Sequence, residues 1–146
     1  MVAASSEIQW ACIRKSSCFL RKQRGVNKTF TREPMNLTGI NSFVFNGLIH
    51  KDGIAVETNS ENKGVTLSLK KTKCHSKPAK SLTRINLRKG GRKTCKTIKN
   101  VVKMSNVRPA LSAVAQRRAC QILRSQKPPR PQTLTKSKRQ KKEKSK

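Results

Sequence analysis

Val107 to Pro128, VRPALSAVAQRRACQILRSQKP, is the stretch that decides the fold of this chain. Asn106 suits an N-cap, Pro109 suits a first helical turn, and the Pro128-Pro129 pair prevents a helix from continuing. Apolar residues recur within the stretch at three- and four-residue steps, which places them on one helical face: Val107, Leu111, Val114, Ala115 and Ile122. The pattern predicts a helix that packs one face on a core.

A second face of this helix is polar and basic. Arg117, Gln121 and Arg124 fall together at helical spacing and can present guanidinium groups to an anion. Arg118 projects from the apolar side and has two interpretations. The preferred one is that its stem packs on the core and its head reaches solvent. The alternative is an arginine held by the core and aimed at a phosphate.

Residues 92–105 predict another helix just upstream. Cys95, Ile98, Val101 and Val102 form an apolar stripe. Five cations cluster within about a third of the circumference on the other side: Arg92, Lys93, Lys96, Lys99 and Lys103. No acidic residue is interleaved with them, so an anionic partner is favoured over a merely solvated face. The turn at residues 106–109 joins the two helices into a hairpin.

The first half of the chain predicts strands. Residues 65–70, VTLSLK, alternate with period two, and Ile54 to Glu57 follows the Asp52-Gly53 turn signal. Residues 18–22 and the β-rich run 42–45 are further candidates. Ser6 and Gln9 have the form of a capping box and predict a short helix over residues 7–15, with Ile8, Ala11 and Cys12 on one side.

These elements predict an α+β fold, in which a small antiparallel sheet is covered by the short N-terminal helix and the C-terminal helical hairpin. We expect a flexible N-terminus at residues 1–6 and a single α+β domain at residues 7–128. A basic arm without periodicity is expected at about residues 71–91, and a disordered Lys-rich tail at residues 129–146.

The net charge of +29 is unevenly distributed over the 146 residues. Residues 1–61 hold eight Lys and Arg against five Asp and Glu, whereas residues 62–146 hold 27 against Glu143 alone. Such a segment cannot neutralise itself, and a nucleic acid is the obvious polyanion to compensate it. An acidic membrane surface is the competitor, but no stretch approaches the roughly 18 apolar residues of a spanning helix. Arg14 and Lys15 interrupt any signal-peptide core, which indicates a soluble intracellular protein.

Neither a metal site nor a catalytic site is indicated. The five cysteines are irregularly spaced and contain no C-x-x-C pair, and nothing near Cys74 and His75 completes a tetrahedron. Nucleotide-binding, zinc-protease and serine-hydrolase motifs are absent, and His50 has no pattern that links it to a nucleophile. We therefore expect no cofactor, no small-molecule substrate and no enzymatic activity.

The aromatic residues have two interpretations each. Trp10, the only tryptophan, is preferred as an anchor of the N-terminal helix on the core, with base stacking as the alternative. Phe43 and Phe45 would suit a sheet of the RRM type, on which bases stack, but the RNP sequence signature of that module is missing. They are assigned to the core.

Several short runs resemble the eukaryotic large-ribosomal-subunit protein twenty-eight family. In order, these runs are Gln9-Trp10, Ser16-Ser17, Phe19-Leu20, Glu33-Pro34-x-Asn36-Leu37, Asn41-Ser42-Phe43-x-x-Asn46-Gly47-Leu48-Ile49-His50, Arg117-Arg118-Ala119 and Ile122-Leu123-Arg124-Ser125-Gln126-Lys127-Pro128. The resemblance extends from about Ile8 to Pro128. It implies a structural protein on the surface of the cytosolic large subunit, bound to ribosomal RNA and adjacent to other large-subunit proteins. It also implies a cytoplasmic location, with passage through the nucleolus during assembly.

The expected mechanism is neutralisation of RNA phosphates by exposed cations. The candidate RNA-binding residues are Arg92, Lys93, Lys96, Lys99, Lys103, Arg117, Arg118, Arg124, Lys127 and Arg130. The alternative is a basic chaperone or regulator that binds nucleic acid outside the ribosome. An enzyme of unrecognised type is the third hypothesis, and it would require a cleft with convergent polar groups.

Overall fold

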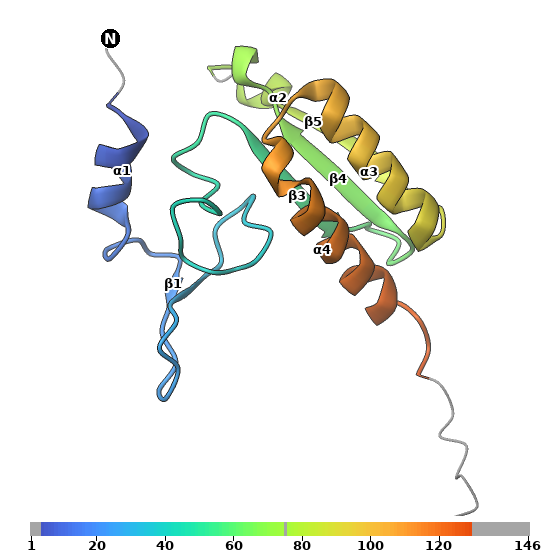
Figure 1. Ribbon diagram of the computed structural model, residues 1–146, viewed down its shortest axis with the longest axis horizontal. Coiled ribbons are helices and arrows are strands. Elements are labelled where there is room, and N and C mark those ends of the chain that lie inside the picture. Colours follow the sequence, from blue (N-terminus) through green and yellow to red (C-terminus); the bar gives the residue numbers. More distant parts are fainter. Residues whose placement is uncertain (1–3, 75, 130–146) are drawn as a thin grey trace, which may run out of the picture.

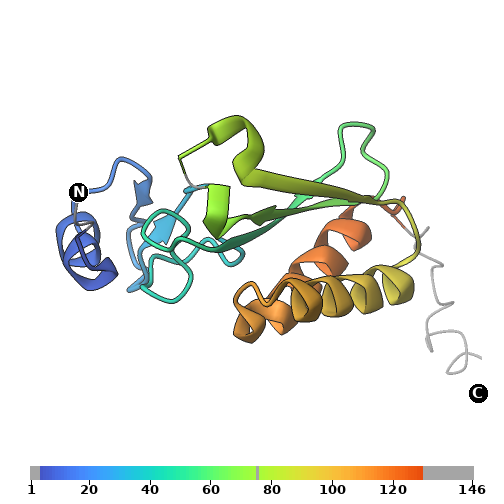
Figure 2. The ribbon, with the colours of Figure 1, turned by 90° about the horizontal axis from the view of Figure 1, so that it is seen from above.

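The body of the molecule has two layers, a three-stranded sheet and a helical hairpin that covers one of its faces (Figures 1 and 2). The computed structural model describes residues 4–74 and 76–129. The sheet is antiparallel with strand order β3-β4-β5, and its strands are β3 (Gly53–Thr58), β4 (Val65–Lys70) and β5 (Leu82–Leu87). The hairpin consists of α3 (Gly91–Ser105) and α4 (Ser112–Ser125). The predicted α+β class is confirmed.

The strand register explains how one face of the sheet becomes the core. Val56, Leu67 and Ile85 lie opposite one another across the three strands. Ile54 and Leu69 form a parallel row one step away, so the alternation seen in residues 65–70 places its apolar side chains under the helices. Ile98 and Val102 of α3 and Ala115 and Ala119 of α4 complete this core. The small alanines let α4 approach the sheet closely.

The turn between the two helices differs from the prediction. Asn106 does not cap α4; it adopts a left-handed conformation (φ 50°) and ends α3. Arg108 is also left-handed, and a short 3-10 turn, η2 (Pro109–Leu111), precedes α4. The helix therefore begins at Ser112, because Asn tolerates the left-handed conformation that closes a helix and Pro109 starts the next turn.

The expected basic arm at residues 71–91 is wrong in its second half. Residues 71–91 contain η1 (Thr72–Cys74), α2 (Pro78–Ser81) and the edge strand β5. Ile85 and Leu87 face the helices while Arg84 and Asn86 are exposed, so this strand alternates like β4. Pairing with β4 along its whole length adds to the stability of this edge strand.

The N-terminal segment lies at one end of the body rather than over the sheet (Figure 1). Helix α1 (Ser6–Ile13) is capped by Ser5, one residue earlier than predicted, and contributes no buried residue. Ile8, Ala11 and Cys12 are all exposed, so the predicted cover of the sheet by this helix is wrong. A two-residue ladder joins β1 (Leu20–Arg21) to β2 (Phe30–Thr31), and residues 42–45, predicted as a strand, form a turn.

A buried carboxylate organises the loop between β2 and β3. Glu33 accepts hydrogen bonds from the side-chain amides of Asn36 (2.7 Å) and Asn46 (2.6 Å). The side-chain oxygen of Asn46, Oδ1, in turn accepts from the backbone N–H groups of Leu48 and Ile49. Burial raises the pKa of Glu33, and the hydrogen bonds from Asn36 and the Gly47 backbone lower it in part. These polar contacts therefore fix the conformation of this loop.

Three contacts attach the outer segments to the body. Leu37 is buried in the core, and the Arg108 guanidinium donates to the backbone oxygen of Val44. Gln126, just after α4, makes a two-point contact with Gly64 in the β3–β4 turn: Gly64 N–H donates to its Oε1 (3.0 Å) and its Nε2 donates to the Gly64 oxygen (2.8 Å). These contacts fix both ends of the helical hairpin against the rest of the chain.

Candidate nucleic-acid interface

The cations of α3 lie opposite its buried stripe. Thr94, Ile98 and Val102 are each almost fully buried and follow one another at four-residue steps. The basic residues of the helix occur at intermediate positions on the opposite side, and all of them are exposed: Arg92, Lys93, Lys96, Lys99 and Lys103. The predicted division of this helix into a core face and a basic face is confirmed.

Helix α4 repeats this division. Ala115, Ala119 and Ile122 are buried, whereas Arg117 and Arg124 are exposed. Arg118 is exposed as well, which agrees with a head that reaches solvent rather than a guanidinium held by the core. The core residue that the sequence pattern missed is Ala119, because alanine gives a weak apolar signal.

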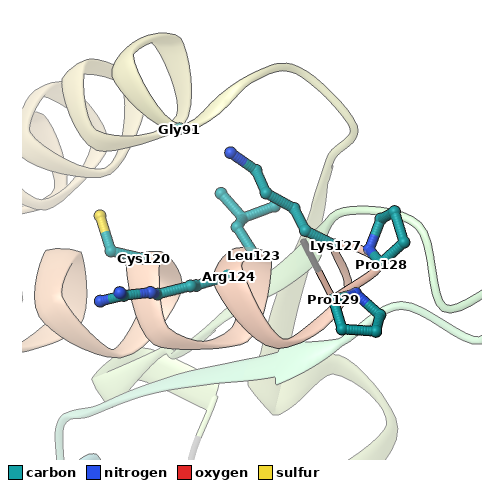
Figure 3. Close-up of a pocket in the computed structure, with 7 residues that line it drawn as sticks. All are labelled: Gly91, Cys120, Leu123, Arg124, Lys127, Pro128 and Pro129. Atoms are coloured by element: carbon teal, nitrogen blue, oxygen red, sulfur yellow. The ribbon is translucent and has the colours of Figure 1, made fainter. Parts of the chain in front are cut away.

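The end of the hairpin near Gly91 brings several predicted residues together. The start of α3 meets the end of α4 there, and a cavity of about 650 Å³ is lined by Gly91, Arg124 and Lys127 together with Cys120 and Leu123. Figure 3 shows the Lys127 ammonium group directed toward Gly91. A neighbouring cavity of about 570 Å³ is lined by Lys89, Arg92 and Lys93. This end of the hairpin therefore concentrates positive charge from two helices and one turn.

The other predicted residues are not part of that concentration. Lys103 lies near the end of α3 that is remote from Gly91, and Lys96 and Lys99 lie between the two ends. Arg130 is outside the described residues. We use the name basic hairpin surface for the exposed cations of α3 and α4 together with Lys127, two residues beyond α4: Arg92, Lys93, Lys96, Lys99, Lys103, Arg117, Arg118, Arg124 and Lys127.

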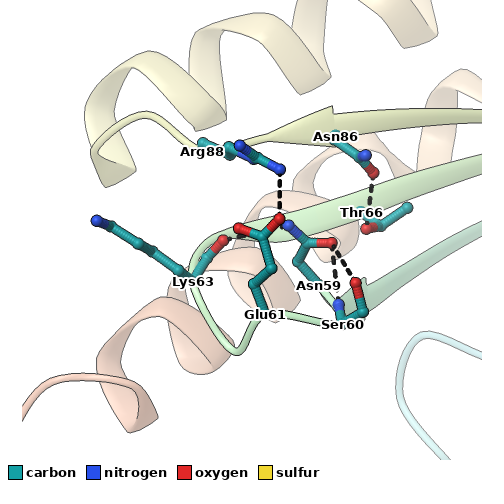
Figure 4. A network of polar contacts seen from close by, with 7 residues as sticks. All are labelled: Asn59, Ser60, Glu61, Lys63, Thr66, Asn86 and Arg88. Carbon is teal, nitrogen blue, oxygen red and sulfur yellow. Dashed lines mark hydrogen bonds and ion pairs between the residues drawn. The ribbon is translucent and has the colours of Figure 1, made fainter.

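Acidic side chains are absent from the basic hairpin surface. The one ion pair within residues 4–74 and 76–129 joins Arg88 to Glu61 at 2.7 Å, in the polar network beside the β3–β4 turn (Figure 4). Both partners are more than half exposed, so the pair contributes little to stability. The cations of the hairpin thus have no ion-pair partner in the described part of the chain, and their charge is available to an external anion.

Lys89 is a further cation beside the basic hairpin surface that sequence reasoning missed. The sequence places Lys89 in the basic arm expected at about residues 71–91, whereas the structure places it in the short turn between β5 and α3, beside Arg92 and Lys93. The alternation of residues 82–87 is the signal that would have ended the arm before Lys89.

The aromatic side chains gather away from the basic hairpin surface. Trp10 meets Phe43 edge to face at 6.2 Å, and Phe43 meets His50 at 5.1 Å. Trp10 therefore anchors α1 on the loop of residues 41–50 rather than on the sheet core. Phe45 packs against the core as expected, whereas Phe43 belongs to this separate cluster.

Neither a metal centre nor a membrane span emerges from the described residues. No group of three His, Cys, Asp or Glu side chains there is arranged to hold a metal ion, and His75 lies outside them. No helix in residues 4–74 and 76–129 has the length and apolar character needed to cross a bilayer.

Comparisons with known proteins agree on one family. A sequence model of the Ribosomal L28e protein family matches residues 8–125. "Large ribosomal subunit protein eL28" of Caenorhabditis elegans is 36% identical over 122 residues, which cover 84% of this chain and 90% of that protein. The protein of the same name from Schizosaccharomyces pombe is 32% identical over 131 residues, which cover 87% of this chain and 96% of the relative.

Proposed function

The chain belongs to the Ribosomal L28e protein family, a family of ribosomal structural proteins rather than enzymes, and we propose that it stabilises large-subunit ribosomal RNA through its basic hairpin surface. The observation that carries this proposal is the set of exposed cations on α3 and α4, which have no ion-pair partner among residues 4–74 and 76–129. RNA is the polyanion of a ribosome, and each phosphate that Lys or Arg neutralises also releases condensed counterions.

The fold determines the spacing of these charges. The cations stand on two helices that are packed on one sheet, so their mutual distances are set by the core beneath them. A rigid array of this kind recognises the shape of an RNA backbone rather than its bases. Arg124 and Lys127 of the Gly91 end would contact phosphates at one point, and Lys103 at a point nearer the other end of the hairpin.

The same proposal gives the protein its partners and location. It would sit between ribosomal RNA and neighbouring large-subunit proteins on the cytoplasmic ribosome, after assembly in the nucleolus. An extra-ribosomal chaperone would bind RNA by the same surface but would detach from large subunits in a high-salt wash. A built-in component stays with the subunit, so sedimentation after that wash distinguishes the two functions.

Replacing Lys96, Lys99 and Lys103 with Gln tests the surface directly. All three are exposed, so the fold should be retained. The salt dependence of binding to ribosomal RNA fragments should fall by roughly two to three phosphate equivalents, because each lost contact removes about 0.7–0.9 from the log–log slope. Binding is measured at several salt concentrations, with circular dichroism as the folding control.

The matched control replaces Lys15, Lys22 and Lys28 with Gln. These lysines are also exposed and lie in the N-terminal segment, so the change in net charge is identical. The control should retain most of the slope. Equal losses in both variants would show that only total charge matters, and an unchanged slope in the helix variant would remove α3 from the interface.

A further inference from the structure

Two cysteines face each other across the helical hairpin. The sulfur of Cys95 on α3 lies 3.3 Å from the sulfur of Cys120 on α4, and both are free thiols. The helix spacing is fixed at this level, because the Gln116 side-chain amide donates to the backbone oxygen of Cys95 (3.2 Å). A disulfide bond needs about 2.05 Å between the sulfurs, so small side-chain rotations would close the gap.

The two thiols differ in accessibility. Cys120 is exposed, whereas Cys95 is half-buried. Burial raises the pKa of the Cys95 thiol, and its hydrogen bond to Cys120 and the charge of Cys120 act in the same direction. Cys95 therefore holds its proton more firmly than a free cysteine, and Cys120 is the thiol that an incoming reagent meets first.

The surroundings of Cys120 favour a negatively charged reagent. Cys120 lines the same cavity as Arg124 and Lys127, and Figure 3 shows its sulfur directed toward α3. Two cations beside an exposed thiol attract the carboxylates of such a reagent.

We propose that Cys95 and Cys120 form a reversible dithiol site that reacts with small anionic disulfides, of the class of oxidised glutathione, and closes to a disulfide between α3 and α4. The thiolate of Cys120 attacks one sulfur of the reagent and expels the other half, which takes up the proton lost by Cys120. Cys95 then loses its proton and attacks the Cys120 sulfur, releasing the second half as a thiol. Two protein thiols are oxidised, and one small disulfide is reduced to two thiols.

The dithiol is the resting form in a reducing compartment, because an exposed disulfide is readily reduced by the glutathione pool. The site closes when the proportion of oxidised glutathione rises. This thiol exchange needs no RNA, so its failure would leave the proposed RNA-binding role untouched, and failure of RNA binding would leave the exchange untouched.

The test uses the full chain with Cys12, Cys18 and Cys74 replaced by Ser, so that only the pair remains. The folded protein is treated with oxidised glutathione, digested with trypsin without reductant and analysed by mass spectrometry. Cleavage at Lys93, Lys96, Arg118 and Arg124 should release peptide 94–96 disulfide-linked to peptide 119–124. Proximity should favour the cross-link over a glutathione adduct by about tenfold or more, and dithiothreitol should abolish it.

Two controls make the outcome decisive. Cys95→Ser should leave a stable glutathione adduct on Cys120, because the second thiol is missing, whereas Cys120→Ser should react slowly at the half-buried Cys95. The same protein in guanidinium chloride should cross-link several-fold less. Equal cross-linking of folded and unfolded chains, or a persistent adduct on Cys120 while Cys95 is present, would overturn the proposal.

Discussion

At the scale of single residues, the conspicuous polar side chains of the chain act as structural connectors. The Glu33 carboxylate and the Asn46 amide lie in the runs on which the family resemblance rests, and both are buried in one hydrogen-bond network. Gln126, in the last of those runs, holds the β3–β4 turn. Sequence alone identified these residues as characteristic, but their role depends on partners 13 and 62 positions away.

Glu33→Gln should destabilise the fold by about 1–3 kcal/mol at neutral pH, because its amide group would place a donor against a donor of Asn36 or Asn46. The pH dependence should change too. The pKa of Glu33 is raised in the folded state, so the folded protein binds that proton more tightly than the unfolded chain. The contribution of Glu33 to stability therefore falls as pH rises from about 4.3 through the raised pKa.

Urea unfolding of the wild type and Glu33→Gln at a series of pH values measures both effects. The wild type should show a decline in that window that the variant lacks. Parallel stability profiles would show that Glu33 has the same pKa in both states.

Gln126→Ala should lower the free energy of unfolding by about 1–2 kcal/mol, since it removes two hydrogen bonds to the Gly64 backbone. Gly64→Ala should cost at least as much. Gly64 has φ +87°, and a Cβ there would overlap the carbonyl oxygen of Leu87. Chemical denaturation checks both variants against Gln121→Ala, a matched change at an exposed position of α4. A loss for Gln121→Ala as large as that for Gln126→Ala would mean that helix propensity, not the contact with Gly64, is responsible.

At the scale of elements, sequence periodicity predicted the helices and strands that bury a regular apolar face. Strand β4 has the bounds predicted for it, and α3 begins one residue earlier than expected. Strand β5 was missed because only Ile85 and Leu87 mark its inward face while Leu82 is exposed, and the ladder with β4 adds to its stability. The start of α4 was misplaced because Asn106 suits both ends of a helix, and the backbone conformation that decides between them depends on the turn.

For helix α1, the sequence predicted the element but not the surface on which it packs. Its cap signal was right to within one residue, yet the surface that it packs on is the aromatic cluster around Phe43, which sequence pattern did not indicate. The same limit applies to the interface. The exposed cations of both helices were predicted from spacing alone, whereas their convergence near Gly91 depends on how α3 and α4 meet.

Ile98→Asp should unfold the domain. Ile98 is 0% exposed at the centre of α3, and a buried unpaired carboxylate costs several kcal/mol, a large part of the stability of a small domain. Asn100→Asp introduces the same side chain at an exposed position two residues further on and should leave the thermal transition nearly unchanged. Circular dichroism of both variants provides the measurement; a cooperative transition in Ile98→Asp at the wild-type temperature would contradict the assigned core.

At the scale of the whole molecule, charge is separated along the chain. The N-terminal segment has nearly balanced charge, whereas the sheet-and-hairpin body and the residues after it have 27 cations and a single carboxylate beyond Glu61. Self-repulsion of this kind opposes compaction in the free protein and is relieved by an anionic partner. The same feature therefore weakens the isolated fold and favours its complex with RNA.

Deleting residues 130–146 should separate these two effects. The deletion removes eight cations and Glu143 from a stretch without an apolar pattern. Affinity for ribosomal RNA fragments should fall and its salt dependence should weaken, while thermal unfolding of residues 1–129 stays nearly unchanged. A truncated chain that loses its cooperative transition would show that the tail packs on the body, contrary to the prediction of a disordered tail.

The peripheral position of α1 has a consequence for amide hydrogen exchange. No side chain of α1 is buried, and β1 and β2 share a ladder of only two residue pairs, whereas β4 is hydrogen-bonded on both edges and covered by two helices. The amides of α1 can therefore exchange through local fraying that leaves the rest intact. Those of β4 can exchange only when the molecule unfolds as a whole, so the chain contains a fast-exchanging N-terminal unit and a slow-exchanging body.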